Sequence, residues 1–216
     1  EDGIRDLVRS RGLGDVYKRQ FTRVVGKKGL VVYVYGMGKK GNLNPESLRV
    51  SSAAVAKACI NDKINSVAFL MPAEVKDLAS SQATAEGLVL GSYQFNEFKT
   101  TRDDISLLES ASIVGGDKKS IEKGSVIANS VCFARDLENR PGNIATPSHL
   151  AEHAKKIGKS SSVKVTIFER DKFTKMGMGA LAGVASGTEE PPKFIIMEYF
   201  NGPKNEKPKI YLQSLI

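Results

Sequence analysis

The stretch that decides how this chain is organised is Cys132–Pro147, CFARDLENRPGNIATP. The residues before and into it, from Ser120 to Asn139, carry apolar side chains at near-helical spacing, which predicts a helix. Pro141 and Gly142 stop that helix, because proline lacks the backbone donor and glycine readily adopts left-handed angles. Thr146-Pro147 is a typical N-cap followed by a typical first helical residue, so a second helix begins at once. A helix, a break and a recapped helix predict a joint between two folded units.

The same segment resembles the entrance to the catalytic domain of the leucyl aminopeptidases, the cytosol aminopeptidases with two metal ions. The resemblance covers roughly residues 24–212. It is carried by Ala134-Arg135-Asp136-Leu137, Asn139, Pro141, Asn143, Thr146-Pro147, Lys175–Gly187, Glu190–Ile195 and Glu198-Tyr199. It implies a fragment of a metal-dependent aminopeptidase, with an α/β N-terminal domain of the macro type (a mixed or parallel sheet), a linker helix and an incomplete α/β peptidase domain.

Four segments are expected on this basis. Residues 21–118 form the N-terminal α/β domain, residues 119–140 the linker helix, and residues 141–216 the truncated start of the catalytic domain. Residues 1–20 have no sustained periodicity, and Ser10–Gln20 resembles a translated sequencing adapter. Such a tail is excluded from fold reasoning, although a natural basic extension is the alternative interpretation.

The composition is that of a soluble globular protein, with 41% hydrophobic and 26% charged residues in a chain of 216. We find no apolar run long enough to span a membrane and no secretory signal pattern. Cys59 and Cys132 each lie within an apolar helical pattern, which favours free thiols over a disulfide. We therefore expect a cytoplasmic protein with no membrane partner.

The net charge of +8 leaves a second class of function open. A basic chain can bind nucleic acid, so an α/β module that binds nucleic acid or a nucleotide without enzymatic activity is the alternative. Against it, the lysines and arginines are scattered in pairs between acids, with no zinc-finger spacing and no continuous basic helix. This pattern favours a solvated surface.

Strand-like and helix-like runs alternate through the first half of the chain, which predicts an α/β fold with a mostly parallel sheet. The expected strands are residues 29–35, 64–71 and 106–114, and the expected helices are residues 45–62 and 75–90, with Gly91 as the stop. The unbroken apolar run at 29–35 predicts a strand buried on both faces. After the joint, the strands are expected at residues 163–168, 193–200 and 209–212, with a short helix at 170–176. The glycines at 177, 179, 183 and 187 are expected to allow close backbone approach.

Gly36–Gly41 formally matches the G-x-G-x-x-G pattern of dinucleotide-binding loops. In such a site the helix opens at the glycines, so that its N-terminus faces the pyrophosphate. Here the helix is expected to open later, at Asn44-Pro45. We interpret Gly36–Gly41 as a structural loop.

His149 and His153 lie four residues apart on a predicted helix and could face one ligand. A zinc peptidase helix would read H-E-x-x-H, whereas this one misplaces the acid and offers no third ligand. We interpret both as surface histidines. The acidic pairs Asp103-Asp104 and Glu189-Glu190 lie in polar loops and are interpreted as solvated charge.

The resemblance also implies where the chemistry of the family lies. In leucyl aminopeptidases a glycine-lysine-glycine stretch follows the strand that Ile210–Leu212 resembles, and a lysine and aspartates from there onward hold two divalent metals, zinc or manganese. Gln213–Ile216 stands in that place here, as in a truncated or frame-shifted read. We therefore expect no catalytic, cofactor-binding or metal-binding residue in this chain. The full-length family member is expected to act on peptides as a homo-hexamer.

Overall fold

The computed structural model describes residues 21–26, 30–75, 77–101 and 105–203. The chain divides into two compact units, Glu1–Asp136 and Leu137–Ile216, and each is described by itself. The expectations for residues 1–20, for Asp103-Asp104 and for residues 204–216 lie outside the described residues. Among the helices described, none is long and apolar enough to cross a membrane.

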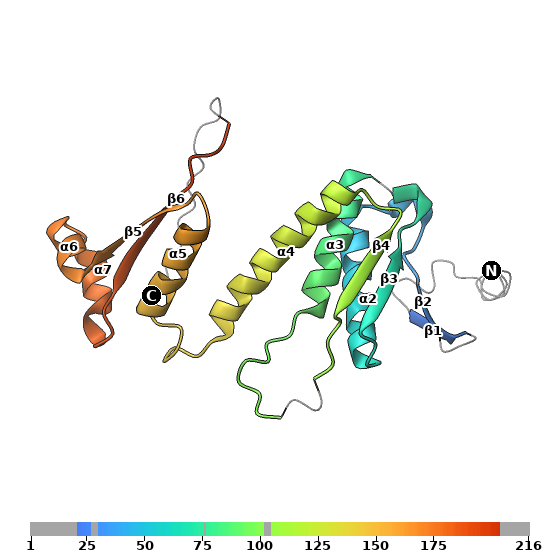
Figure 1. Ribbon diagram of the computed structural model, residues 1–216, viewed down its shortest axis with the longest axis horizontal. Helices are drawn as coiled ribbons and strands as arrows, with labels where there is room; N and C mark the ends of the chain where they lie inside the picture. Colours follow the sequence, from blue (N-terminus) through green and yellow to red (C-terminus); the bar gives the residue numbers. More distant parts are fainter. Residues whose placement is uncertain (1–20, 27–29, 76, 102–104, 204–216) are drawn as a thin grey trace. The chain divides into compact units, whose positions relative to one another are not determined.

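The first unit alternates strands and helices (Figure 1). Its elements are β1 (Phe21–Val25), β2 (Val31–Tyr35), η3 (Lys40–Asn42), α2 (Pro45–Asn61), β3 (Ser66–Leu70), η4 (Ala73–Val75), α3 (Leu78–Ser92), β4 (Ser110–Val114) and α4 (Lys118–Asn139), whose last residues belong to the second unit. β3 and β4 pair in parallel, with Phe69 opposite Ile113, and α3 lies between them in the chain. The predicted α/β class is confirmed.

The strand predicted at residues 29–35 is found as β2, but the prediction that it is buried on both faces is wrong. β2 pairs antiparallel with β1, with Arg23 opposite Tyr33, and its residues are half-buried rather than buried on both faces. The two strands stay paired at their connected ends, where the Gly26 amide donates to the Leu30 carbonyl at 2.6 Å. A continuous apolar run does not reveal which strand it pairs with, so the hairpin partner at residues 21–25 was missed. The described strands of this unit form one parallel and one antiparallel pair.

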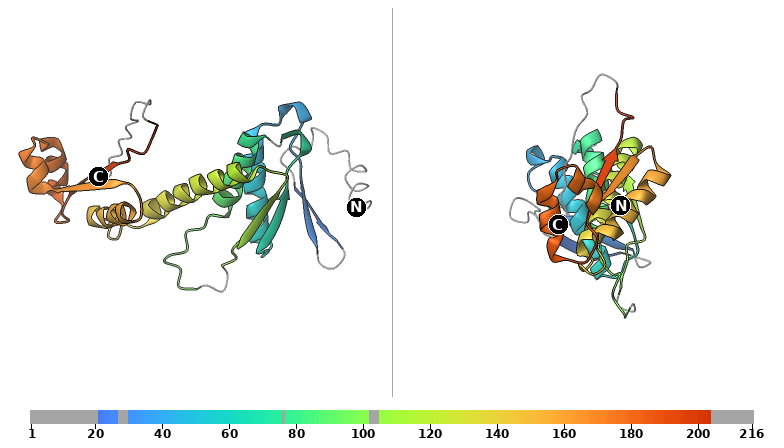
Figure 2. Two further views of the ribbon diagram at one scale, coloured as in Figure 1. Left: turned by 45° about the horizontal axis from the view of Figure 1, so that its top comes forward. Right: turned by 90° about the vertical axis from the view of Figure 1, so that its left-hand side faces the viewer.

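α2 and α3 pack against each other and against the β3–β4 pair (Figures 1 and 2). The predicted start of α2 is confirmed, because the side chain of Asn44 accepts from the Ser47 amide at 2.9 Å and Pro45 occupies the first turn. The core of the unit lies between these layers. It consists of Leu48, Val55, Ala56, Cys59, Phe69, Met71, Val75 and Leu88.

Two details of α3 differ from the prediction. The helix expected from residue 75 begins only at Leu78, after the cap Asp77, and Leu78 itself is 65% exposed. Gly91 does not stop the helix, which continues to Ser92. A Cβ at Gly91 would lie 2.5 Å from the Cα of Ala53, so this glycine is required by the close approach of α3 to α2.

The predicted helix before the joint is confirmed as α4. Asp117 caps it by accepting from the Ser120 amide at 2.9 Å. The helix approaches α3 closely at Gly124, where a Cβ would lie 2.4 Å from the carbonyl oxygen of Gln82. Of the apolar residues that set its periodicity, Val126 is 67% exposed, so the regular spacing does not mark a fully buried face.

The second unit contains α5 (Pro147–Ser160), β5 (Lys164–Glu169), α6 (Arg170–Lys175), α7 (Gly179–Val184), η5 (Ala185–Gly187) and β6 (Lys193–Glu198). β5 and β6 pair antiparallel, and α5 packs on them through the buried residues Ala151 and Ala154 (Figure 2). The rings of Phe168 and Phe194, opposite each other across the strands, are stacked with their centroids 6.3 Å apart. Such cross-strand pairs stabilise a sheet.

The glycine-rich stretch after α6 does not have the role that we predicted. A Cβ at Gly179, Gly183 or Gly187 would meet no atom of the described residues within 4 Å. Gly177 instead has a backbone φ of +83°, which glycine adopts without steric cost. Its amide donates to the carbonyl of Thr174 at 2.9 Å and terminates α6.

Candidate functional site

The break between α4 and α5 forms a tight turn that brings Arg140 to the start of α5. The amides of Ile144 and Ala145 both donate to the carbonyl of Pro141, at 2.8 and 2.9 Å. Thr146 then caps α5, because its hydroxyl accepts from the His149 amide at 3.2 Å. The predicted cap and first turn of α5 are confirmed.

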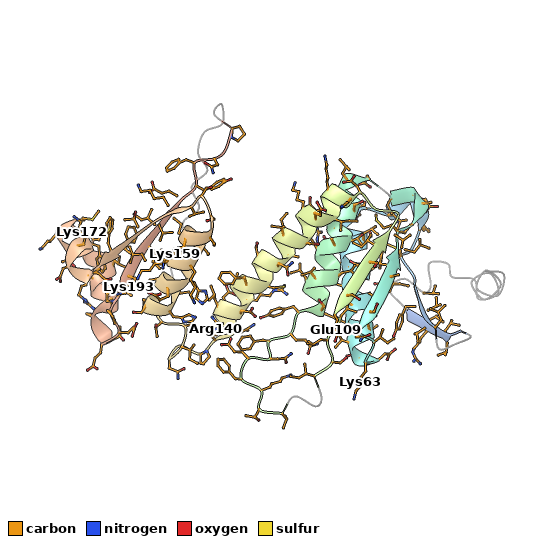
Figure 3. The ribbon with its side chains drawn as sticks, in the orientation of Figure 1. Lys63, Glu109, Arg140, Lys159, Lys172 and Lys193 are labelled. Carbon is orange, nitrogen blue, oxygen red and sulfur yellow. The ribbon has the colours of Figure 1, made fainter. Side chains whose placement is uncertain are left out.

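Three nitrogen-bearing side chains meet at this turn. The Nε2 atoms of His149 and His153 lie 3.1 Å apart, and the guanidinium Nη1 of Arg140 lies 2.8 Å from the first and 3.3 Å from the second. Figure 3 draws these side chains, with Arg140 labelled. Both histidines are half-buried, and their rings meet edge to face with centroids 4.6 Å apart. The structure therefore brings together the two histidines that the sequence singled out, and adds an arginine that spacing alone did not reveal.

The surroundings of the cluster favour the neutral form of one imidazole. Burial lowers the pKa of His153 below its ordinary value, and the nearby His149, Arg140 and Lys156 lower it further. A neutral imidazole keeps a lone pair on one ring nitrogen, so it can accept a hydrogen bond or bind a metal ion.

A cleft of about 330 Å³ lies between α5 and the β5–β6 pair. Its lining residues are Ser148, Ala151, Glu152, Lys155, Ile167, Glu169 and Lys193. The four charged side chains form two ion pairs, Glu152 with Lys155 at 3.0 Å and Glu169 with Lys193. Of these residues, Figure 3 labels Lys193. The hydrogen bond from Lys155 holds the pKa of Glu152 below its ordinary value. Both carboxylates of the cleft are thus neutralised by ammonium groups within it.

The prediction of solvated charge holds for only one residue of the pair Glu189-Glu190. Glu189 is exposed, but Glu190 is half-buried, and its Oε1 atom is covered with no hydrogen-bond partner among the described residues. A loop that the sequence marks as polar therefore buries part of a carboxylate.

The last two residues of Gly36–Gly41 lie in the short helix η3 (Lys40–Asn42), and α2 begins only at Pro45. The predicted helix start is therefore confirmed. A pyrophosphate site requires a helix that begins at the glycines, and α2 does not begin there.

Both cysteines are free, and Cys59 is buried in the core of the first unit. Within the described ranges, no group of three or more histidine, cysteine, aspartate or glutamate side chains could hold a metal ion. A two-metal centre needs several ligands converging on ions about 3.5–4 Å apart. The described residues, where His149 and His153 contribute two nitrogens, do not fit such a centre.

The fold is that of metallopeptidases of the aminopeptidase class. The structure is similar to a mutant of tomato leucine aminopeptidase, with a TM-score of 0.73 and 30% sequence identity over 90% of this chain and 41% of that one. It is also similar in fold to the bottromycin maturation enzyme BotP in complex with Mn, with a TM-score of 0.77 and 22% identity over 91% of this chain and 42% of that one.

Two family models match the amino-acid sequence and identify the family. Residues 18–102 match the family model of the cytosol aminopeptidase N-terminal domain, and residues 132–212 match that of the cytosol aminopeptidase catalytic domain. A probable cytosol aminopeptidase of Geotalea uraniireducens is 34% identical over 90% of this chain and 43% of its own length. This chain belongs to the cytosol aminopeptidase family. It spans less than half the length of the curated relatives that it matches.

Proposed function

We propose that this chain serves as the N-terminal domain and the first part of the catalytic domain of a metal-dependent aminopeptidase, which hydrolyses the first peptide bond of its substrates. The observation that carries the proposal is the order of the two family matches. The N-terminal domain matches at residues 18–102 and the catalytic domain at residues 132–212, and the break at Pro141 lies within the second match.

The finer proposals follow from the family. The domains are residues 21–118, a linker helix at 119–140 and the catalytic part from residue 141, with residues 1–20 outside the fold. The complete enzyme uses two divalent ions, zinc or manganese, acts in the cytoplasm on peptides and assembles as a homo-hexamer. Manganese is supported by the complex of BotP with Mn, and a cytosolic location by the description of the relatives.

We further propose that the 216 residues by themselves are inert as a peptidase. The support is that the described residues do not fit a two-metal centre and that the cleft carboxylates are paired with lysines. Two metal ions supply a hydroxide nucleophile and stabilise the oxyanion in enzymes of this kind. The role of the described residues is then to form the scaffold on which that centre is built.

The test begins with the DNA beyond the codon of Leu212. We expect an open frame that encodes a glycine-lysine-glycine stretch, and we expect its product to hydrolyse leucyl-4-nitroanilide. A chelator should abolish that activity, and added manganese or zinc should restore it. A continuing frame whose product folds but does not cleave aminoacyl substrates with either metal would contradict the proposal.

A further inference from the structure

We propose that His149 and His153 form a bidentate site for one transition-metal ion of the zinc, nickel and copper type. This site uses residues of this chain alone, and it does not depend on the proposed function.

The first argument is the separation of the two nitrogens. Zinc binds imidazole nitrogen at about 2.0–2.1 Å, and two nitrogens on one ion, at angles between a right angle and the tetrahedral angle, lie roughly 2.9–3.4 Å apart. The two Nε2 atoms lie 3.1 Å apart in the structure. The side chains therefore already have the separation that a shared ion requires.

The second argument is the rigidity of the backbone that carries the pair. Residues four apart on a helix lie on one face, so the two imidazoles project together. α5 is fixed at its start by the Thr146 cap, and it is held to the β5–β6 sheet through the buried Ala151 and Ala154. A preorganised pair binds more tightly than two independent histidines, because less side-chain freedom is lost.

Arg140 limits the affinity of the histidine pair for a metal ion. Its guanidinium Nη1 lies within hydrogen-bonding distance of both nitrogens that the ion needs, and arginine has no lone pair with which to bind a metal. An entering ion must displace this hydrogen bond and then bind beside a positive charge. We therefore expect affinity well below that of a structural zinc site with four protein ligands, and the remaining coordination positions are left to water.

The chemistry of the donors defines the ion. Imidazole nitrogen suits zinc, nickel and copper, whereas magnesium and calcium require oxygen ligands. The nearest acidic side chain on the same helix, Glu152, is paired with Lys155. The pair should accordingly discriminate strongly against magnesium.

The experiment is calorimetric titration of the untagged full chain with zinc chloride and nickel chloride, with magnesium chloride as the ion control. We expect saturable binding of one zinc or nickel ion at the pair and none of magnesium. His149→Gln and His153→Gln should each weaken the binding about tenfold or more, because a chelate becomes a single ligand. Lys159→Gln, an exposed change near the end of the same helix, should leave the affinity unchanged.

The most informative variant is Arg140→Gln. It removes the guanidinium that competes with the ion for the two Nε2 atoms, and it should raise the affinity for zinc severalfold. Circular dichroism establishes that each variant is folded. Zinc binding that is equal in the parent chain and in a folded His149→Gln/His153→Gln double variant would overturn the proposal. So would the absence of saturable binding in both the parent and the Arg140→Gln variant. Neither result bears on the peptidase proposal, which is tested by the activity of the longer frame.

Discussion

The phenolic hydroxyl of Tyr93 donates a hydrogen bond of 2.8 Å to Oδ1 of Asp136, 43 residues further along the chain. The guanidinium of Arg135 lies 5.4 Å from the centroid of the same ring, within reach of a cation–π contact. The two contacts join the end of α3 to the end of α4. Arg135 and Asp136 belong to the sequence run that carried the family resemblance, so part of that run holds α4 against the end of α3.

Replacing Tyr93 by Phe should therefore destabilise the first unit by about 1 kcal/mol, because Asp136 loses a partner while most of the ring packing stays. Asp136→Ala, which removes the accepting oxygen, should cost a similar amount. In urea denaturation the double variant should cost less than the sum of the two single changes, since both remove the same bond. Tyr199→Phe, at an exposed position, is the control. Strict additivity of the two changes would contradict a direct coupling.

The close approach of α3 to α2 predicts that Gly91→Ala destabilises the first unit by about 1–3 kcal/mol, because the new Cβ would overlap the backbone of Ala53. Gly142→Ala adds the same methyl group in the joint, where no described atom lies within 4 Å. Thermal unfolding of the two variants compares them directly. An equal melting temperature for parent and Gly91→Ala would mean that α3 packs differently.

The two thiols should react in a fixed order. Cys59 is fully buried, and burial raises the pKa of both Cys59 and Cys132, so both are poorer nucleophiles than an ordinary thiol. Cys132 is only half-buried and should react first with a maleimide, whereas Cys59 should need urea. Peptide mapping after brief labelling identifies the modified residue. Labelling of Cys59 before Cys132 in native buffer would be incompatible with the core described here.

The hairpin should lose stability in alkali. Burial, followed by the hydrogen bond to Asp62, raises the pKa of Tyr33 to about 12. This folded-state pKa lies above the unfolded value of about 10. The contribution of Tyr33 to the free energy of unfolding is therefore intact below pH 10 and is lost as the pH rises toward 12. The urea midpoint should fall with pH across this window less steeply in Tyr33→Phe than in the parent. Identical slopes in the two proteins would show that Tyr33 titrates normally.

Sequence reasoning succeeded where the determinants are local. The starts of α2 and α5 follow from Asn44-Pro45 and Thr146-Pro147, because a cap and the residue after it act within one turn. The break between α4 and α5 at Pro141 follows in the same way from the inability of its residues to continue a helix. The family could be recognised because its residues recur at fixed spacings.

Sequence reasoning failed where contacts distant in the chain decide. The pairing of β2 with β1 depends on which strand returns beside it, and an apolar run does not encode that choice. The role of Gly91 depends on α2, and the contact of Arg140 with the histidine pair depends on the path of the joint. The four-residue spacing of His149 and His153 did predict a shared helix face, but not the distance between their nitrogens.

The central proposal is that this chain is part of a metal-dependent aminopeptidase and does not by itself contain the two-metal centre of that enzyme. The most direct measurement is the rate at which the purified 216-residue chain hydrolyses leucyl-4-nitroanilide in the presence of manganese or zinc. The preparation must be free of peptidases from the expression host. The account predicts no turnover above the rate without protein. Turnover that a chelator abolishes and either metal restores would contradict it, and would point to a catalytic centre among residues to which we assign none.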